Sequence, residues 1–166
     1  MNLIFEQVIR KEEEKISKVY EIIKDCGESM YRENGLLHWR HPYPIEAIRK
    51  NCGEREVFLG KDVKKDIYVH TFQLEYIVEY SDGKENVVAI INKFATVPQL
   101  AGNGIGKLSI DYIEKYCRKK GILKIKLDVY EKSERAIKFY MQRGFRITGS
   151  RQTRHFTVNL MEKQLI

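Results

Sequence analysis

The segment Val97-Pro98-Gln99-Leu100-Ala101-Gly102-Asn103-Gly104-Ile105-Gly106-Lys107 separates two different patterns in this sequence. Before it, the apolar residues of 86–96 predict a β-strand. After it, apolar residues recur at helical spacing, namely Ile105, Leu108, Tyr112, Ile113, Tyr116 and Cys117. A glycine-rich turn between a strand and a helix aims backbone N–H groups and the positive end of a helix dipole at one point. The segment therefore predicts a phosphate site.

The elements around this segment predict a mixed sheet. Residues 122–129 alternate between apolar and polar and predict a strand, which the intervening helix should make parallel to 86–96. Ser133 is a fair N-cap for a further helix that Gly144 closes. The other predicted strands are 3–10, 56–60, 66–80, 145–149 and 155–161, and the other helices are 12–34 and a short one that Pro44 opens. The expected fold class is α/β, an α+β mixed sheet in the order β-α-α-β-β-β-α-β-α-β-β.

The composition indicates one globular domain over residues 1–166. A chain of 166 residues with 43% hydrophobic positions can bury a core, and it has no repeat or linker-like tract. Its three cysteines are an odd number in no C-x-x-C arrangement, so we expect a reducing, cytoplasmic location. No apolar run approaches the ~20 residues of a membrane span, and we expect neither secretion nor membrane insertion.

The positive charge of the chain is unevenly distributed. Residues 1–90 hold 14 Lys and Arg against 17 Asp and Glu, a net charge of −3, whereas residues 91–166 hold 16 against 6, a net of +10. This asymmetry predicts an anionic partner for the second half: nucleic acid, a membrane surface or a phosphorylated small molecule.

Two common nucleotide motifs fit the glycine turn poorly. A Walker A loop needs Ser or Thr where Leu108 stands. The dinucleotide fingerprint would use Gly102 and Gly104 but finds Lys107 in place of its third glycine, although Asp128 has about the spacing of a ribose ligand. The antiparallel strands expected before the turn also disfavour a doubly wound sheet. A glycine turn with a purely structural role, and no bound phosphate, is another alternative.

A third motif fits better. Residues 98–107, with the helix after them, resemble the pyrophosphate loop of the GNAT N-acetyltransferase superfamily, whose pattern is Q/R-x-x-G-x-G/A. We place this pattern on Ala101-Gly102-Asn103-Gly104-Ile105-Gly106, where alanine replaces the usual Gln or Arg. The register that begins at Gln99 matches the pattern literally but starts the helix two residues early.

The second signature of this superfamily, N-x-x-A-x-x-x-Y-x-x-x-G-F, is similar to Ser133-x-x-Ala136-x-x-x-Tyr140-x-x-x-Gly144-Phe145, with serine in place of asparagine. The two motifs occur in the family's order, so together they are more specific than either alone. The resemblance in element order covers nearly the whole chain, and the motifs lie within residues 92–145.

The resemblance implies an N-acetyltransferase in which an amine attacks the thioester of acetyl-CoA directly. A backbone N–H near Ala95 or Thr96 would polarise the thioester carbonyl. Tyr140 would be the general acid, because a phenol stays protonated at neutral pH and can protonate the thiolate; the alternative is a core aromatic. The implied cofactor-binding residues are Phe94, Ala95, Thr96, Ala101, Gly102, Asn103, Gly104, Ile105, Gly106, Lys107, Ser133 and Ala136.

The acceptor side gives fewer signals. The loop 38–43 lies where this family often shapes its acceptor pocket, and Trp39 and Tyr43 are suited to stack on a substrate or contact an ammonium; Trp39 is equally suited to a core position. His38 and His41 have no cysteine or nearby histidine to complete a metal site, so we expect no metal. The general base stays unassigned, with candidates Glu75, Glu79 and Glu85 or a water chain.

We expect a small-molecule amine as acceptor, with a protein N-terminus or lysine as the alternative and a non-catalytic acyl-CoA sensor as a further one. The acidic first half suits a cationic amine. The basic run Arg118-Lys119-Lys120 ends a helix, where it complements the helix dipole, so we expect no nucleic acid partner. A homodimer is a further expectation.

Overall fold

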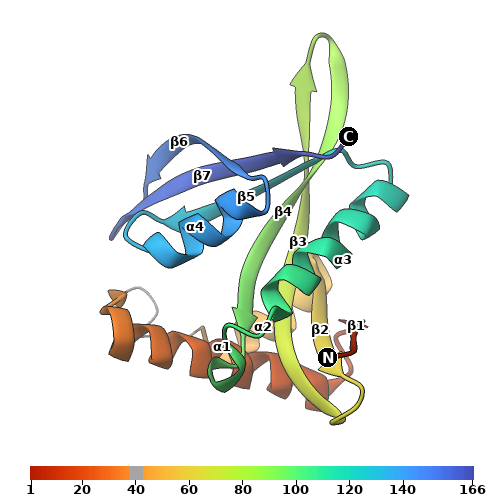
Figure 1. Cartoon of the computed structure of the whole chain (residues 1–166). Coiled ribbons are helices and arrows are strands. Elements are labelled where there is room, and N and C mark those ends of the chain that lie inside the picture. Colours follow the sequence, from red (N-terminus) through yellow and green to blue (C-terminus); the bar gives the residue numbers. More distant parts are fainter. Residues whose placement is uncertain (38–42) are drawn as a thin grey trace. The chain divides into compact units, whose positions relative to one another are not determined.

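The computed structural model covers residues 1–166 and describes all of them except residues 38–42 (Figure 1). Its strands are β1 (Leu3–Val8), β2 (Glu56–Asp62), β3 (Ile67–Ser81), β4 (Lys84–Thr96), β5 (Lys124–Tyr130), β6 (Arg146–Gln152) and β7 (Thr157–Gln164). Its helices are α1 (Glu13–Asn34), α2 (Ile45–Glu54), α3 (Ile105–Lys119) and α4 (Glu134–Gln142), with a short 3₁₀ helix, η2 (Pro98–Leu100), before α3. The predicted fold class and element order are confirmed.

Some boundaries differ from the prediction. β1 ends at Val8 rather than at residue 10, because a tight turn follows it: the Ile9 N–H donates to Glu12 Oε1 and the Glu12 N–H donates to the Ile9 carbonyl, both at 3.0 Å. β2 continues to Asp62, which pairs with Leu3 at the far end of the β1–β2 ladder.

The strands form one seven-stranded sheet in the order β1-β2-β3-β4-β5-β7-β6. β1 and β3 each pair antiparallel with β2, and β7 pairs antiparallel with β5 and with β6. β4 and β5 are parallel, as expected for a β-α-β crossover. Their register contains only the pairs Ala89–Ile125 and Ile90–Lys126, although both strands continue further.

The chain divides into two compact units, which we describe separately. The first contains Met1–Glu75 and Lys93–Ser109, and the second contains Tyr76–Asn92 and Ile110–Ile166. A single domain over residues 1–166 stays a prediction.

In the first unit, α1 and α2 cover the β1–β2 part of the sheet. The α1 residues Ile16, Val19 and Ile23 are buried together with Val57 and Leu59 of β2. This packing follows from apolar residues spaced three and four apart on the helix, which form one face. On β2 and β3, the rings of Phe58 and Phe72 stack with centroids 4.9 Å apart.

In the second unit, α3, β5, β7, α4 and the residues after α4 all contribute buried side chains, among them Ile113, Ile125, Met161, Tyr140 and Phe145. Ser133 stands at the predicted N-cap position of α4, but its hydroxyl makes no capping hydrogen bond. The prediction of the cap was therefore wrong in its chemistry. The Ser133 backbone (φ −81°, ψ 69°) departs from the extended conformation in which N-cap side chains reach the first turn.

Candidate active site

The glycine turn before α3 has the backbone that an anion site requires. Gly102 and Gly104 have φ of +83° and +81°, the left-handed region that side chains disfavour. α3 begins at Ile105, where the register on Ala101 places it, and the buried Ile105 side chain anchors this start. Residues 101–104 are exposed, and Asn103 Nδ2 donates to the Leu100 carbonyl at 3.0 Å.

The electrostatics of this turn favour a negative charge. The first turn of α3 contains no acidic residue and carries the exposed Lys107. The first N–H groups of a helix have no intrahelical partners, and the helix dipole is positive at this end. The turn can therefore hold a diphosphate through its backbone, which does not depend on the side chain that Ala101 lacks.

The end of β4 places the other predicted residues of the first unit. Ala95 is buried against the α1–α2 core, whereas Phe94 and Thr96 both contact His70 of β3. Thr96 Oγ1 lies 2.8 Å from His70 Nδ1, and the Phe94 ring meets the His70 ring edge-on at 4.5 Å. The structure therefore brings Phe94 and Thr96 together through a histidine.

Sequence reasoning missed His70 because nothing in its local pattern distinguishes it from other strand residues. The side chain is fully buried, and burial lowers the pKa of His70 to about 3, so the ring is neutral. Its Nε2 has no hydrogen-bond partner among the described residues.

Lys93, also missed from the sequence, lies on β4 two residues before Ala95. Its ammonium donates to Asn51 Oδ1 at 2.6 Å and lies 4.1 Å from the centroid of the Tyr43 ring. Burial, and secondarily the charge of Arg55, lower the pKa of Lys93 to about 8. Tyr43 does contact an ammonium, as its residue type allowed, but this ammonium belongs to the chain itself. Trp39, His38 and His41 lie outside the described residues.

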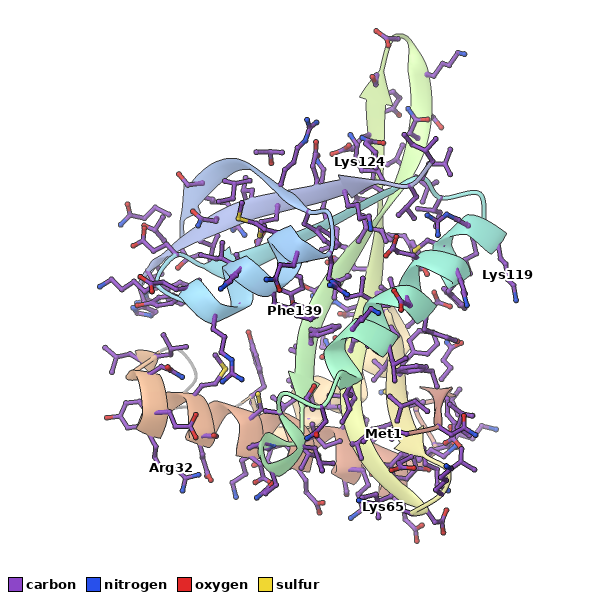
Figure 2. All side chains as sticks on the ribbon, viewed as in Figure 1. Met1, Arg32, Lys65, Lys119, Lys124 and Phe139 are labelled. Atoms are coloured by element: carbon purple, nitrogen blue, oxygen red, sulfur yellow. The ribbon has the colours of Figure 1, made fainter. Side chains whose placement is uncertain are left out.

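In the second unit, Tyr140 lies on α4 and is 8% exposed. Its ring meets those of Phe139 (labelled in Figure 2) and Phe145 edge-on, with ring centroids 5.2 and 5.7 Å apart. Ser133 is buried and Ala136 is half-buried on the same helix segment. The Tyr140 ring therefore packs against two other aromatic rings.

The three carboxylates considered as a base are all engaged. Glu79 accepts hydrogen bonds from Lys126 and, at 3.2 Å, from Lys124, and chiefly the Lys126 bond lowers its pKa. Glu85 accepts from the Tyr80 hydroxyl at 3.0 Å. Glu75 lies 3.9 Å from Arg55 Nη2.

Within residues 1–37 and 43–166, no group of three or more His, Cys, Asp or Glu side chains is arranged to hold a metal ion. In the same part of the chain, no helix is long and apolar enough to cross a membrane.

The structure combines a mixed sheet with a glycine turn at the start of the helix that connects the parallel strands β4 and β5. Residues 70–145 match the acetyltransferase (GNAT) family, and this match supports an acyltransferase enzyme. The resemblance found in the sequence is thereby confirmed. A comparison with curated proteins gives no match.

Solved structures share the fold over the whole chain. The PaiA N-acetyltransferase from Thermoplasma acidophilum, in complex with coenzyme A, has a TM-score of 0.70 at 18% identity, covering 99% of both chains. A chimera of the spermidine N-acetyltransferase SpeG from Vibrio cholerae and hSSAT has 0.71 at 16% identity, covering 99% of this chain and 96% of that one. Arabidopsis thaliana NAA60, in complex with a bisubstrate analogue, has a TM-score of 0.71 at 15% identity, covering 99% of this chain and 100% of that one.

Proposed function

We propose that this protein transfers the acetyl group of acetyl-CoA to the primary amine of a small molecule by direct attack. The observation that carries this proposal is the pair of left-handed glycines, Gly102 and Gly104, before an α3 helix without acidic residues in its first turn. The backbone amides of 101–106 and Lys107 hold the diphosphate of coenzyme A, and Ser133 and Ala136 contact the cofactor from α4.

The chemistry needs one carbonyl to be polarised and one thiolate to be protonated. A backbone N–H near Ala95 or Thr96 donates to the thioester oxygen and holds the negative charge that develops on it. The amine nitrogen bonds to the carbonyl carbon as the C–S bond breaks, and Tyr140 gives its phenolic proton to the departing sulfur. The amine loses its proton to water, since Glu79, Glu85 and Glu75 are engaged elsewhere.

Relatives of this fold differ in acceptor, since one is a spermidine N-acetyltransferase and another is a ribosomal-protein-S18-alanine N-acetyltransferase from Escherichia coli. A protein N-terminus or lysine is therefore the second candidate acceptor. A cytoplasmic location and a homodimer stay predictions.

The test is a thiol-release assay with acetyl-CoA and a panel of amines, run on the wild type, Tyr140→Phe and Tyr112→Phe. Tyr112 is the matched control because it is a tyrosine of α3, stacked on Tyr116 with centroids 5.9 Å apart. Loss of a general acid should lower kcat about 100-fold or more, while the control keeps its rate. A Tyr140→Phe enzyme as fast as the wild type would show that Tyr140 is a core aromatic. If none of the small-molecule amines causes coenzyme A release but a peptide does, the acceptor is a protein.

A further inference from the structure

A buried polar network in the first unit ends on Lys93. Arg55, which lies between α2 and β2, donates to Gln73 Oε1 at 3.2 Å. Gln73 Nε2 in turn donates to Asn51 Oδ1 at 3.1 Å, and the same oxygen accepts from Lys93 Nζ at 2.6 Å. Gln73 is 0% exposed and Asn51 is 7% exposed. Because Gln73 Oε1 accepts from Arg55, its Nε2 is turned toward Asn51, and the Asn51 Oδ1 that accepts from Gln73 also accepts from Lys93. The network therefore orients the Lys93 side chain.

The Lys93 ammonium is placed without a counter-charge. Among residues 1–37 and 43–166, no carboxylate forms an ion pair with it within 4.0 Å. Its described partners are a neutral amide oxygen and the Tyr43 ring, which leave hydrogen-bonding capacity on an ammonium that has three N–H groups. The nearby Arg55 adds a second positive charge that disfavours the first.

The backbone at Lys93 is also unusual. Its φ is +49°, inside a strand and at a residue with a long side chain. Such a conformation is unfavourable by about 1–3 kcal/mol and concentrates at ligand-binding and catalytic sites. It occurs two residues before Ala95, roughly 7 Å along the strand from the N–H groups assigned to the thioester.

Given the acetyl transfer proposed above, we propose that the acceptor amine carries an anionic group, and that Lys93 binds this group as a specificity-determining residue. An anion at Lys93 pairs with its ammonium and compensates the charge of Arg55. The lowered pKa of Lys93 agrees with this role, because it reports an ammonium that its surroundings leave unstabilised. The acceptor class is then an amino acid or a phosphorylated amine, rather than the purely cationic amine that the acidic first half of the sequence suggested.

The first experiment compares matched acceptors in the thiol-release assay. The twenty amino acids are paired with their carboxamides, and O-phosphoethanolamine is paired with ethanolamine, which separates the carboxylate from the phosphate source. One charge-assisted hydrogen bond should favour the anionic member of the best pair about 10- to 100-fold in kcat/KM. Lys93→Met should remove that preference through KM, and Lys93→Arg should restore part of it.

Lys50→Met is the matched control, because Lys50 precedes Asn51 on α2 and its side chain is 73% exposed. This variant loses the same charge from the same unit and should keep the preference. A wild-type preference for the neutral member, or a preference that survives in Lys93→Met, overturns the proposal.

The second experiment does not depend on catalysis. The Lys93 ammonium is titrated by ¹⁵Nζ NMR in chloride, acetate and inorganic phosphate at equal ionic strength. Acetate or phosphate should raise the pKa of Lys93 above its value in chloride. Equal values in all three salts overturn the anion site even if acetyl transfer is shown, and a raised pKa supports the site even if no amine in the panel is acetylated.

Discussion

Acid should unfold this protein partly through His70. The folded chain buries a neutral imidazole whose pKa is lowered to about 3, whereas the unfolded chain exposes it with its ordinary value of 6.5. Between these values the unfolded state binds the proton and the folded state does not, so the free energy of unfolding falls as pH falls below 6.5. The loss approaches about 1.4 kcal/mol per pH unit and reaches about 2 kcal/mol between pH 7 and pH 5.

The matched variant is His70→Asn, because Asn Nδ2 occupies roughly the place of the His70 Nδ1 that lies 2.8 Å from Thr96 Oγ1. Urea unfolding of both proteins at pH 7, 6 and 5 gives the two profiles. The variant is less stable at pH 7, because a smaller side chain leaves space beside Phe94, but its profile should be flatter by about 2 kcal/mol at pH 5. The carboxylates with lowered pKa values, Glu12 and Glu79 among them, are common to both proteins and cancel.

Parallel profiles for the two proteins would refute this reasoning. The direct readout is the ¹³Cε1 shift of His70 in the folded protein, which should show no titration between pH 7 and 5. A titration near pH 6.5 would mean that the buried ring is reached by water.

Two further predictions concern the glycine turn and an ion pair. Gly104→Ala should lower the free energy of unfolding by about 1–2 kcal/mol, because Gly104 has a φ of +81°, and it should weaken coenzyme A binding in a titration. Gly53→Ala is the control, because Gly53 lies inside α2 and a Cβ there would also meet no neighbour; it should raise the free energy of unfolding by about 0.5–1 kcal/mol. Lower stability in both would contradict the backbone argument. Glu114→Gln removes the carboxylate that Lys163 contacts at 2.9 Å and should lower the free energy of unfolding by about 1–3 kcal/mol. The control is Asp111→Asn: Asp111 is exposed on the same helix, and its replacement should change the free energy of unfolding by less than about 0.5 kcal/mol. Equal effects in urea unfolding would show that the pair is not stabilising.

The order of strands and helices was predictable because it depends on local periodicity. Ile16, Val19 and Ile23 reveal a helix face within one stretch of sequence, and Gly102 and Gly104 reveal a turn that only glycine adopts easily. The glycine turn also predicted a candidate phosphate site, since that chemistry is carried by the backbone of one continuous segment.

The Lys93 network was not predictable for the opposite reason. Its hydrogen-bonded pairs are 18 to 42 residues apart, on α2, β3 and β4 and in the turn before β2, and each bond depends on how these elements align. His70 is similar, because its partner Thr96 lies 26 residues away on another strand. At Ser133, the sequence predicted the N-cap position correctly, but it did not predict the backbone angles on which the capping hydrogen bond depends.

Among the strands of the described residues, β6 is last in the sheet order, and one side of its backbone has no neighbouring strand there. All its residues are exposed, it carries Arg146 and Arg151, and its pairing with β7 shifts register between Ile147 and Gly149. Charged side chains and an irregular ladder keep an open sheet edge from adding strands of another molecule. A dimer formed by extending the sheet through β6 is therefore disfavoured.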